Sequence, residues 1–224
     1  MNAKEIMTAP VVTITPRIPV KDAVGMLLYH RVSGLPVVDD AGRLVGIVTE
    51  ADLLLKEAEE VRPEDPNARW LGGSLWLEHL VSGHSKLVGR TVGEVMTHNV
   101  ITALEETPVH VLASRMVRFK VNRLPITRGA RVVGIVTRAD VLKVFLRTDE
   151  DLSKEARRLI GDFPLADESL EVTVDRGVLM LKGRVRSSGR RVALLQRLGG
   201  IDGLVAVDDH ALEDDETTHA PAVE

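Results

Sequence analysis

Two threonine–aspartate pairs are the residues of this sequence best suited to hold a ligand. Thr49 and Asp52 stand three positions apart, and so do Thr137 and Asp140. At the start of a helix this spacing puts both side chains on one face, beside backbone N–H groups that favour an anionic or oxygen-rich ligand. A carboxylate there can accept hydrogen bonds from the vicinal hydroxyls of a ribose. The alternative is that each Thr and Asp only cap the helix and bond to each other.

Both pairs end a longer motif that occurs twice. Residues 46–52 read Gly-Ile-Val-Thr-Glu-Ala-Asp, and residues 134–140 read Gly-Ile-Val-Thr-Arg-Ala-Asp. Upstream features repeat too, because Pro36 and Pro125 each follow a leucine and lie 89 positions apart. Between these prolines and the repeated motif, the distance between equivalent residues falls from 89 to 88 positions, because the turn there is one residue shorter in the second copy. A slip confined to a turn is expected for two copies of one folding unit.

Each copy is predicted to fold as β-α-β-β-α. A short β-rich run, 11–14 or 100–102, precedes a stretch with helical periodicity, and two strands around a glycine-containing turn precede the Thr-x-x-Asp helix. The predicted buried helix positions are Val20, Ala23, Val24, Leu27 and Leu28 in one copy and Val109, Leu112, Ala113, Met116 and Val117 in the other. The glycine that begins each motif is expected to let a ligand approach the backbone.

Composition narrows the function classes. The 224 residues contain no cysteine, which excludes disulfides and thiolate chemistry, and the net charge of −4 gives no overall attraction to nucleic acid. No signal peptide and no membrane-spanning apolar run is recognisable, so a cytoplasmic location is predicted. The histidines show no paired metal-ligand spacing, and no nucleophile or phosphate loop is present. We therefore expect neither an enzyme nor a metal site.

Residues 1–148 resemble a tandem pair of cystathionine-β-synthase-type (CBS) domains. The resemblance rests on residues 6–8, 32–39, 42–49 and Asp52, and on their counterparts in the second copy. It implies a mixed α/β (α+β) fold with pseudo-two-fold symmetry and two clefts that bind adenosine-containing ligands in this family. By this resemblance the two aspartates hold ribose hydroxyls and the two threonines assist.

The resemblance also implies where a phosphate would bind. Family members often carry a basic residue directly before Leu-Pro, where this chain has Arg123 in the second copy and Gly34 in the first. We therefore expect the cleft that Arg123 reaches to take a phosphorylated ligand, and the other cleft to be weaker, empty or suited to an uncharged nucleoside. The candidate regulatory ligands are AMP, ADP, ATP and S-adenosylmethionine, and no other cofactor is expected.

The predicted nucleotide-binding residues come from both copies. They are Asp140, Thr137, Arg123, Asn122, Ile135, Val136, Thr97, Asp52, Thr49, Ile47, Val48 and Thr8. Here Ile47-Val48 and Ile135-Val136 would form an apolar wall beside the sugar. Secondary phosphate candidates, each alternatively a solvated surface charge, are Lys120, Arg118, Arg138, His30 and Arg31.

Residues from about 150 to 210 resemble a BON domain, through residues 172–185, 190–198 and 201–207. A helix (152–160), a hairpin (170–174 with 178–185), a second helix (192–198) and a last strand (204–207) are predicted. The resemblance implies contact with phospholipid. The cations expected to meet an anionic surface are Lys182, Arg184, Arg186, Arg190 and Arg191, and no acid lies between residues 176 and 201. The alternative is a solvated polar face. Nucleic acid is not expected, because no aromatic residue is interleaved.

The predicted organisation is CBS repeat 1 (1–60), a linker with both tryptophans (61–92), CBS repeat 2 (93–148), the BON domain (149–211) and an acidic disordered tail (212–224). Trp70 and Trp76 lie in an apolar patch that either packs on its own domain or forms an interface. The leading hypothesis is a homodimeric regulatory protein that binds a nucleotide between the repeats and relays this through the BON domain to a protein partner or anionic lipid. The competing hypothesis is a scaffold protein with vacant clefts.

Overall fold

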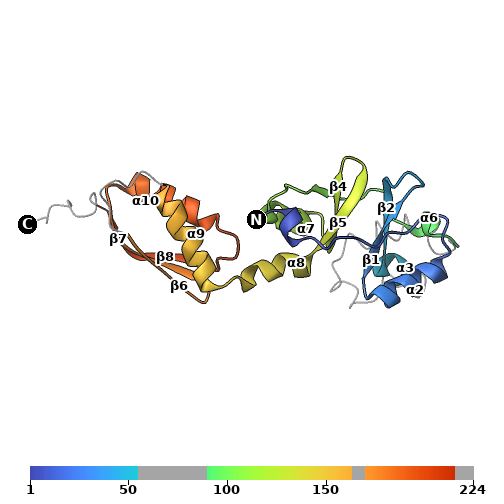
Figure 1. The fold of residues 1–224 in the computed structure, drawn as a ribbon, viewed down its shortest axis with the longest axis horizontal. Coiled ribbons are helices and arrows are strands. Elements are labelled where there is room, and N and C mark those ends of the chain that lie inside the picture. Colours follow the sequence, from blue (N-terminus) through green and yellow to red (C-terminus); the bar gives the residue numbers. More distant parts are fainter. Residues whose placement is uncertain (55–89, 163–169, 215–224) are drawn as a thin grey trace, which may run out of the picture. The chain divides into compact units, whose positions relative to one another are not determined.

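The computed structural model describes residues 1–54, 90–162 and 170–214. The chain forms two compact units (Figure 1). The first unit spans Asn2–Thr137, and the second spans Arg138–Glu224 together with Met1. Trp70 and Trp76, and the linker around them, fall outside the described residues.

The first repeat comprises α1 (Ala3–Ile6), α2 (Val20–His30), β1 (Gly34–Val38), β2 (Leu44–Thr49) and α3 (Glu50–Leu54). Strands β1 and β2 pair in antiparallel fashion, with Gly34 opposite Thr49. The predicted strand at 11–14 is reduced to one parallel bridge, from Ile14 to Val37. The core of this repeat is formed by Ile14, Ala23, Leu27, Leu35, Val37, Val48, Val92, Val95 and Met96.

The second repeat comprises α6 (Val92–Val95), β3 (Ala103–Leu104), α7 (Val109–Arg118), β4 (Arg123–Arg128) and β5 (Arg131–Thr137). Its three-stranded sheet has the order β3-β4-β5. The predicted order of elements is confirmed, but the short strand lies at Ala103–Leu104 instead of 100–102. The reason is that the carbonyl of Thr102 accepts a hydrogen bond from Arg115 at 2.6 Å, and parallel pairing with β4 begins only at Ala103.

The buried stripe of each repeat's long helix is narrower than predicted. Leu28 on α2 is 73% exposed and Val117 on α7 is 75% exposed. The buried positions are Ala23 and Leu27 on α2, and Val109, Leu112 and Met116 on α7. Successive residues of a helix point about 100° apart, so the neighbour of a buried residue turns away from the core. The assignment of Val24, Leu28 and Val117 to the core was therefore wrong.

The two repeats exchange their N-terminal segments. Ala3 of α1 donates its N–H to the carbonyl of Thr107 in the second repeat at 2.9 Å, and Val92 of α6 donates to Ile18 in the first repeat at 2.9 Å. These two bonds occupy equivalent places, as expected for pseudo-two-fold symmetry. Neither repeat is complete without the segment that precedes the other.

The glycines of the repeated motif make room for methionines, which corrects the prediction that they admit a ligand. A Cβ at Gly46 would lie 2.5 Å from Sδ of Met96, and a Cβ at Gly134 would lie even closer to Sδ of Met7. Each methionine belongs to the segment exchanged from the other repeat. Because real Cβ contacts are longer than this, a larger residue at either position would displace the methionine that packs there.

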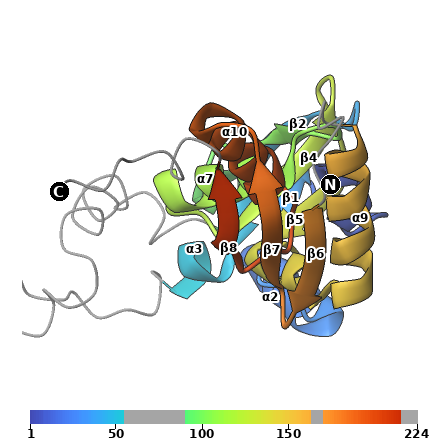
Figure 2. The same ribbon diagram turned by 90° about the vertical axis from the view of Figure 1, so that its left-hand side faces the viewer.

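The second unit contains α8 (Arg138–Lys143), η2 (Val144–Leu146), α9 (Asp149–Gly161), β6 (Leu170–Asp175), β7 (Val178–Val185), α10 (Ser188–Gly199) and β8 (Ala206–Asp214). Its sheet has the order β6-β7-β8, with an antiparallel hairpin and a parallel β7–β8 pair that α10 connects (Figure 2). The predicted helix, hairpin, helix and strand are thus confirmed. The core is formed by Leu152, Ala156, Val172, Leu179, Leu181, Val185, Leu194, Leu198, Ile201 and Leu212.

Strand β8 runs past its predicted end at Val207 and includes residues 212–214, which the sequence assigned to the acidic tail. Leu212 and Asp214 are buried there, and pairing with β7 continues to Val185. The carboxylate of Asp214 accepts a hydrogen bond from Ser188 Oγ at 3.2 Å and lies 3.9 Å from the guanidinium of Arg191. These partners explain why an acidic residue ends a buried strand.

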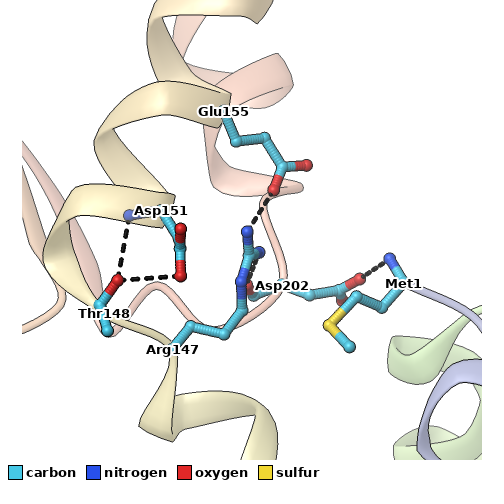
Figure 3. A network of polar contacts seen from close by, with 6 residues as sticks. All are labelled: Met1, Arg147, Thr148, Asp151, Glu155 and Asp202. Carbon is cyan, nitrogen blue, oxygen red and sulfur yellow. Dashed lines mark hydrogen bonds and ion pairs between the residues drawn. The ribbon is translucent and has the colours of Figure 1, made fainter.

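A polar network fixes the entrance to α9 in the second unit (Figure 3). Arg147 donates to the carbonyl of Asp202 at 2.7 Å and to the carboxylate of Glu155 at 2.7 Å. Thr148 caps α9 through its hydroxyl, and the ammonium group of Met1 lies 2.5 Å from the carboxylate of Asp202. Hydrogen bonds therefore connect the segment that follows η2 to α9 and to the loop before β8. No helix in the described ranges combines the length and apolar character that a bilayer crossing requires.

Candidate functional site

Asp52 occupies the start of α3 and is only 5% exposed. Its Oδ2 accepts hydrogen bonds from the backbone N–H of Thr49 at 3.0 Å and from the Thr49 hydroxyl at 2.7 Å. The N–H of Asp52 donates back to Thr49 Oγ1 at 3.4 Å. The reciprocal capping pair that was the alternative interpretation is thus present. It accounts for one oxygen of the carboxylate.

The other oxygen of Asp52 is bonded to the second repeat. Thr97 donates its hydroxyl to Asp52 Oδ1 at 3.1 Å. Thr97 is held in place because it exchanges two backbone hydrogen bonds with Ile47, at 2.9 and 2.8 Å. One carboxylate therefore joins threonines from both repeats, which is an arrangement that local capping alone does not require.

Arg123 approaches the same region from the first residue of β4. Its guanidinium donates to the carbonyl and the hydroxyl of Ser33, the latter at 2.6 Å. Burial lowers the pKa of Arg123, while the negative charges of Glu50 and Asp52 act to raise it. The cation of the second repeat therefore lies close to the acids of the first. We define the first site as Asp52, Thr49, Thr97 and Arg123.

Gly34 makes room for this arginine. A Cβ at Gly34 would lie 2.9 Å from Cζ of Arg123 and closer still to one of its nitrogens. Gly34 and Arg123 begin β1 and β4, and they occupy equivalent positions in the two repeats. The sequence showed the asymmetry between these positions. It gave no sign that one residue fills the space left by the other.

Only part of the predicted apolar wall can face a ligand. Val48 and Val136 are fully buried in the core, whereas Ile47 and Ile135 lie on the opposite faces of β2 and β5. Side chains alternate along a strand, so adjacent residues cannot line the same surface. The wall is therefore reduced to the two isoleucines. Thr8 pairs with Ile135 through two backbone hydrogen bonds, at 2.9 and 3.1 Å, as Thr97 does with Ile47.

The remaining predicted nucleotide-binding residues are dispersed. Thr137 ends β5 and pairs with Arg123 in the sheet register. Asn122, the residue directly before Arg123, is exposed. Asp140 belongs to α8 of the second unit, where it is 6% exposed and lies 2.9 Å from the ammonium group of Lys143. Arg123 is thus grouped with Asp52 in the first unit. Within the described residues no cluster of three His, Asp or Glu side chains could hold a metal ion.

The basic surface predicted on the second unit is largely paired with acids. The ion pairs are Lys182 with Glu171 at 4.0 Å, Arg184 with Glu213 at 3.0 Å and Arg191 with Asp209 at 2.7 Å. The acids come from β6 and β8, on either side of β7. The absence of acids between residues 176 and 201 is therefore a property of the sequence alone, because acids of the flanking strands lie beside three of the five cations. Arg186 lies on the exposed surface after β7, and Arg190 in the first turn of α10.

Comparison with known proteins establishes the family. Residues 3–59 and 92–147 match the CBS domain, and the chain belongs to the CBS domain family. The protein CBSX2 of the Arabidopsis thaliana chloroplast is 32% identical over 141 residues, which are 60% of this chain and 58% of that protein. An L-aspartate semialdehyde sulfurtransferase of Methanocaldococcus jannaschii is 31% identical over 143 residues, 63% of this chain and 23% of the enzyme. The chain thus spans less than two thirds of either relative.

A solved structure of the same relative is also similar. The crystal structure of CBSX2 in complex with AMP is 28% identical in sequence and superposes with a TM-score of 0.53, covering 65% of this chain and 96% of that chain. The tandem CBS pair and its mixed α/β fold are therefore confirmed.

Proposed function

We propose that this protein is a non-catalytic regulatory protein that binds an adenosine-type nucleotide between its two CBS repeats. The observation that carries the proposal is the first site, where the Asp52 carboxylate meets threonines of both repeats near the guanidinium of Arg123. The AMP bound by CBSX2 supports this ligand class. The sulfurtransferase similarity covers only 23% of that enzyme, so it does not argue for catalysis here.

The hydrogen bonds of Asp52 suggest how a ribose would enter. In the proposed complex, a ribose hydroxyl takes the place of the Thr97 hydroxyl at Oδ1, while Thr49 keeps Oδ2 in position. A hydrogen bond to a charged group contributes about 1.5–3 kcal/mol, so replacing one such bond by another is close to neutral. The net affinity then comes from the base, from the phosphate and from additional hydroxyl contacts.

Arg123 is the proposed phosphate-binding residue of the first site. A guanidinium suits this role because its planar fork of donors matches phosphate oxygens. The ligand would exchange the hydrogen bonds from Arg123 to Ser33 for bonds to phosphate. AMP, ADP and ATP are thus favoured at the first site. A second ribose site at Asp140 remains a prediction, and we expect it to be weaker or to accept an uncharged nucleoside or S-adenosylmethionine.

Regulation would follow when a ribose hydroxyl replaces the Thr97 hydroxyl at Asp52. The Thr97–Asp52 hydrogen bond links the two repeats, so a ligand that replaces it changes how strongly they are held together. A ligand shifts a conformational equilibrium only through a difference in affinity between two arrangements. The proposal therefore requires that the arrangement with Thr97 released binds nucleotide more tightly.

The second unit is the proposed output element, with a BON-like role at a protein partner or anionic surface. Support comes from the network of Arg147, which ties the segment after η2 to α9 and to the loop before β8. Because most of the predicted cations are ion-paired, a lipid contact would be weak and sensitive to salt. Co-sedimentation with vesicles containing anionic lipid tests this, with neutral vesicles as the control; equal binding to both would remove the membrane role.

A homodimeric scaffold is the second candidate. Equivalent helical positions carry apolar side chains that face solvent in the described structure, namely Leu28 on α2 and Val117 on α7. Equivalent apolar positions on both repeats suit a symmetric interface with a second copy. In this alternative the inter-repeat bonds of Asp52 are purely structural.

Ligand-dependent stability separates the two candidates. The full chain is titrated by calorimetry with AMP, ADP, ATP and S-adenosylmethionine, and the protein as purified is checked for bound nucleotide by mass spectrometry after denaturation. Ligand at 100 times its dissociation constant is expected to raise the free energy of unfolding by about 2.7 kcal/mol. Absence of heat and of stabilisation with all four ligands would favour the scaffold.

A further inference from the structure

The repeated motif differs between its two copies at a single position. Residues 46–52 and 134–140 are identical, except that Glu50 in the first copy corresponds to Arg138 in the second. These two residues begin α3 and α8, directly after the threonines that end β2 and β5. The one difference therefore reverses a charge inside each Thr-x-x-Asp pair.

Helix formation does not explain the acid at Glu50. An acid in the first turn interacts favourably with the helix dipole and a cation does not, yet α8 begins with Arg138. The start of α3 is capped by Thr49 and Asp52. Glu50 is exposed, and its carboxylate takes no part in this cap. The charge of Glu50 is therefore not needed to start the helix.

Glu50 lies beside the cation of the first site. Its backbone N–H donates to the carbonyl of Ser33 at 3.1 Å, and the guanidinium of Arg123 donates to the same carbonyl. Gly34, where a Cβ would collide with this guanidinium, pairs with Thr49 in the register of β1 and β2. Because Glu50 directly follows Thr49, strand pairing and a shared carbonyl fix its backbone next to Arg123.

Acids outnumber cations around this guanidinium. The charges that act on Arg123 are those of Glu50 and Asp52, and no cation is among them in the described part of the chain. A guanidinium binds one phosphate group through two parallel N–H bonds. Each further phosphate of a ligand adds negative charge near these two acids, without a second cation to balance it.

We propose that Glu50 is a specificity-determining residue of the first site, where its carboxylate makes the site prefer a nucleoside monophosphate to the corresponding di- and triphosphate. The inference rests on the proposed function, because it assigns a ligand class to the same site. A phosphate monoester carries close to two negative charges at pH 7, and each added phosphate increases the repulsion from Glu50. Because Glu50 is exposed, salt screens this repulsion.

Glu50→Gln tests the role of the charge. Glutamine keeps the size of the side chain and the backbone bond to Ser33. Calorimetry of the full chain is done with adenosine, AMP, ADP and ATP, without divalent cations that would neutralise the phosphates. Wild type should bind AMP more tightly than ATP. In Glu50→Gln, ATP affinity relative to AMP should rise about threefold to tenfold, and adenosine affinity should not change.

Two further variants locate the effect. Glu50→Arg introduces the residue of the second copy, which begins α8, and should raise the relative ATP affinity further than glutamine does. Glu106→Gln is the matched control, since Glu106 is an exposed glutamate whose charge acts on Arg128. It should leave all four affinities unchanged. Thermal unfolding checks that each variant is folded. An equal shift in Glu106→Gln would show that net charge alone is responsible, and would overturn the proposal.

Salt separates charge from shape. The preference of wild type for AMP over ATP should weaken as sodium chloride is added, and should depend less on salt in Glu50→Gln. An AMP-to-ATP ratio that is the same in wild type and Glu50→Gln would refute this inference and leave nucleotide binding intact. Absence of heat with all four ligands in wild type would refute the proposed function itself, and this inference with it.

Discussion

The guanidinium of Arg123 occupies the space that a side chain at Gly34 would fill. The two residues begin equivalent strands of the two repeats. At the same position, one repeat therefore has arginine, with its long cationic side chain, and the other has glycine, the smallest residue. The arginine crosses to Ser33 of the first repeat and lies near Glu50 and Asp52. The pseudo-symmetry is thereby broken at the position where a phosphate is expected to bind.

Gly34→Ala tests this relationship. The added Cβ would collide with Arg123, and over-packing of a filled site costs about 1–3 kcal/mol. Urea denaturation of both proteins measures the loss in the free energy of unfolding. Gly25→Ala is the control: nothing lies within 4 Å of its added Cβ, and in the interior of α2 alanine is expected to stabilise by up to about 1 kcal/mol. A Gly34→Ala protein as stable as wild type would show that Arg123 moves aside freely.

The bond between Thr97 and Asp52 is expected to couple the two repeats energetically. Thr97→Val removes the hydroxyl donor, and Asp52→Asn removes the charge that accepts it. A double-mutant cycle on the free energy of unfolding should give an interaction energy of about 0.5–3 kcal/mol. Strictly additive effects would mean that the hydrogen bond between the repeats contributes nothing.

Glu105 gives the stability a defined pH dependence. Its carboxylate accepts hydrogen bonds from Arg128 at 2.7 and 2.8 Å, and these lower the pKa of Glu105 from its ordinary value of 4.5. A depressed pKa in the folded state contributes stability above the unfolded pKa, which is lost as pH falls through the folded value. Wild type should therefore exceed Glu105→Gln in Tm at pH 7, and the difference should shrink below pH 4.5. A difference that is constant down to pH 3 would contradict this origin.

The duplication made the fold largely predictable, because matched strands, turns and helices recur at one offset. Residues whose role depends on the other repeat could not be predicted. Gly46 looked like a ligand contact, but it packs against Met96 from a segment 50 residues later. Leu28 belongs to an apolar pattern that is wider than the buried face of its helix.

The candidate site was predictable only in its residue types. Thr49 and Asp52 are adjacent on one helical turn, so their pairing follows from sequence spacing. The approach of Thr97 and Arg123 to that pair depends on how the repeats associate, which no local pattern encodes. The acids that neutralise the basic hairpin come from flanking strands for the same reason.

AMP binding to Asp52→Asn tests the central claim most directly. Calorimetry should show AMP binding to wild type and at least about tenfold weaker binding to Asp52→Asn, because a carboxylate that accepts ribose hydroxyls is lost. Asp22→Asn, which changes an exposed acid on α2, is the matched control and should bind like wild type. Equal AMP affinity in wild type and Asp52→Asn would contradict nucleotide binding at this carboxylate.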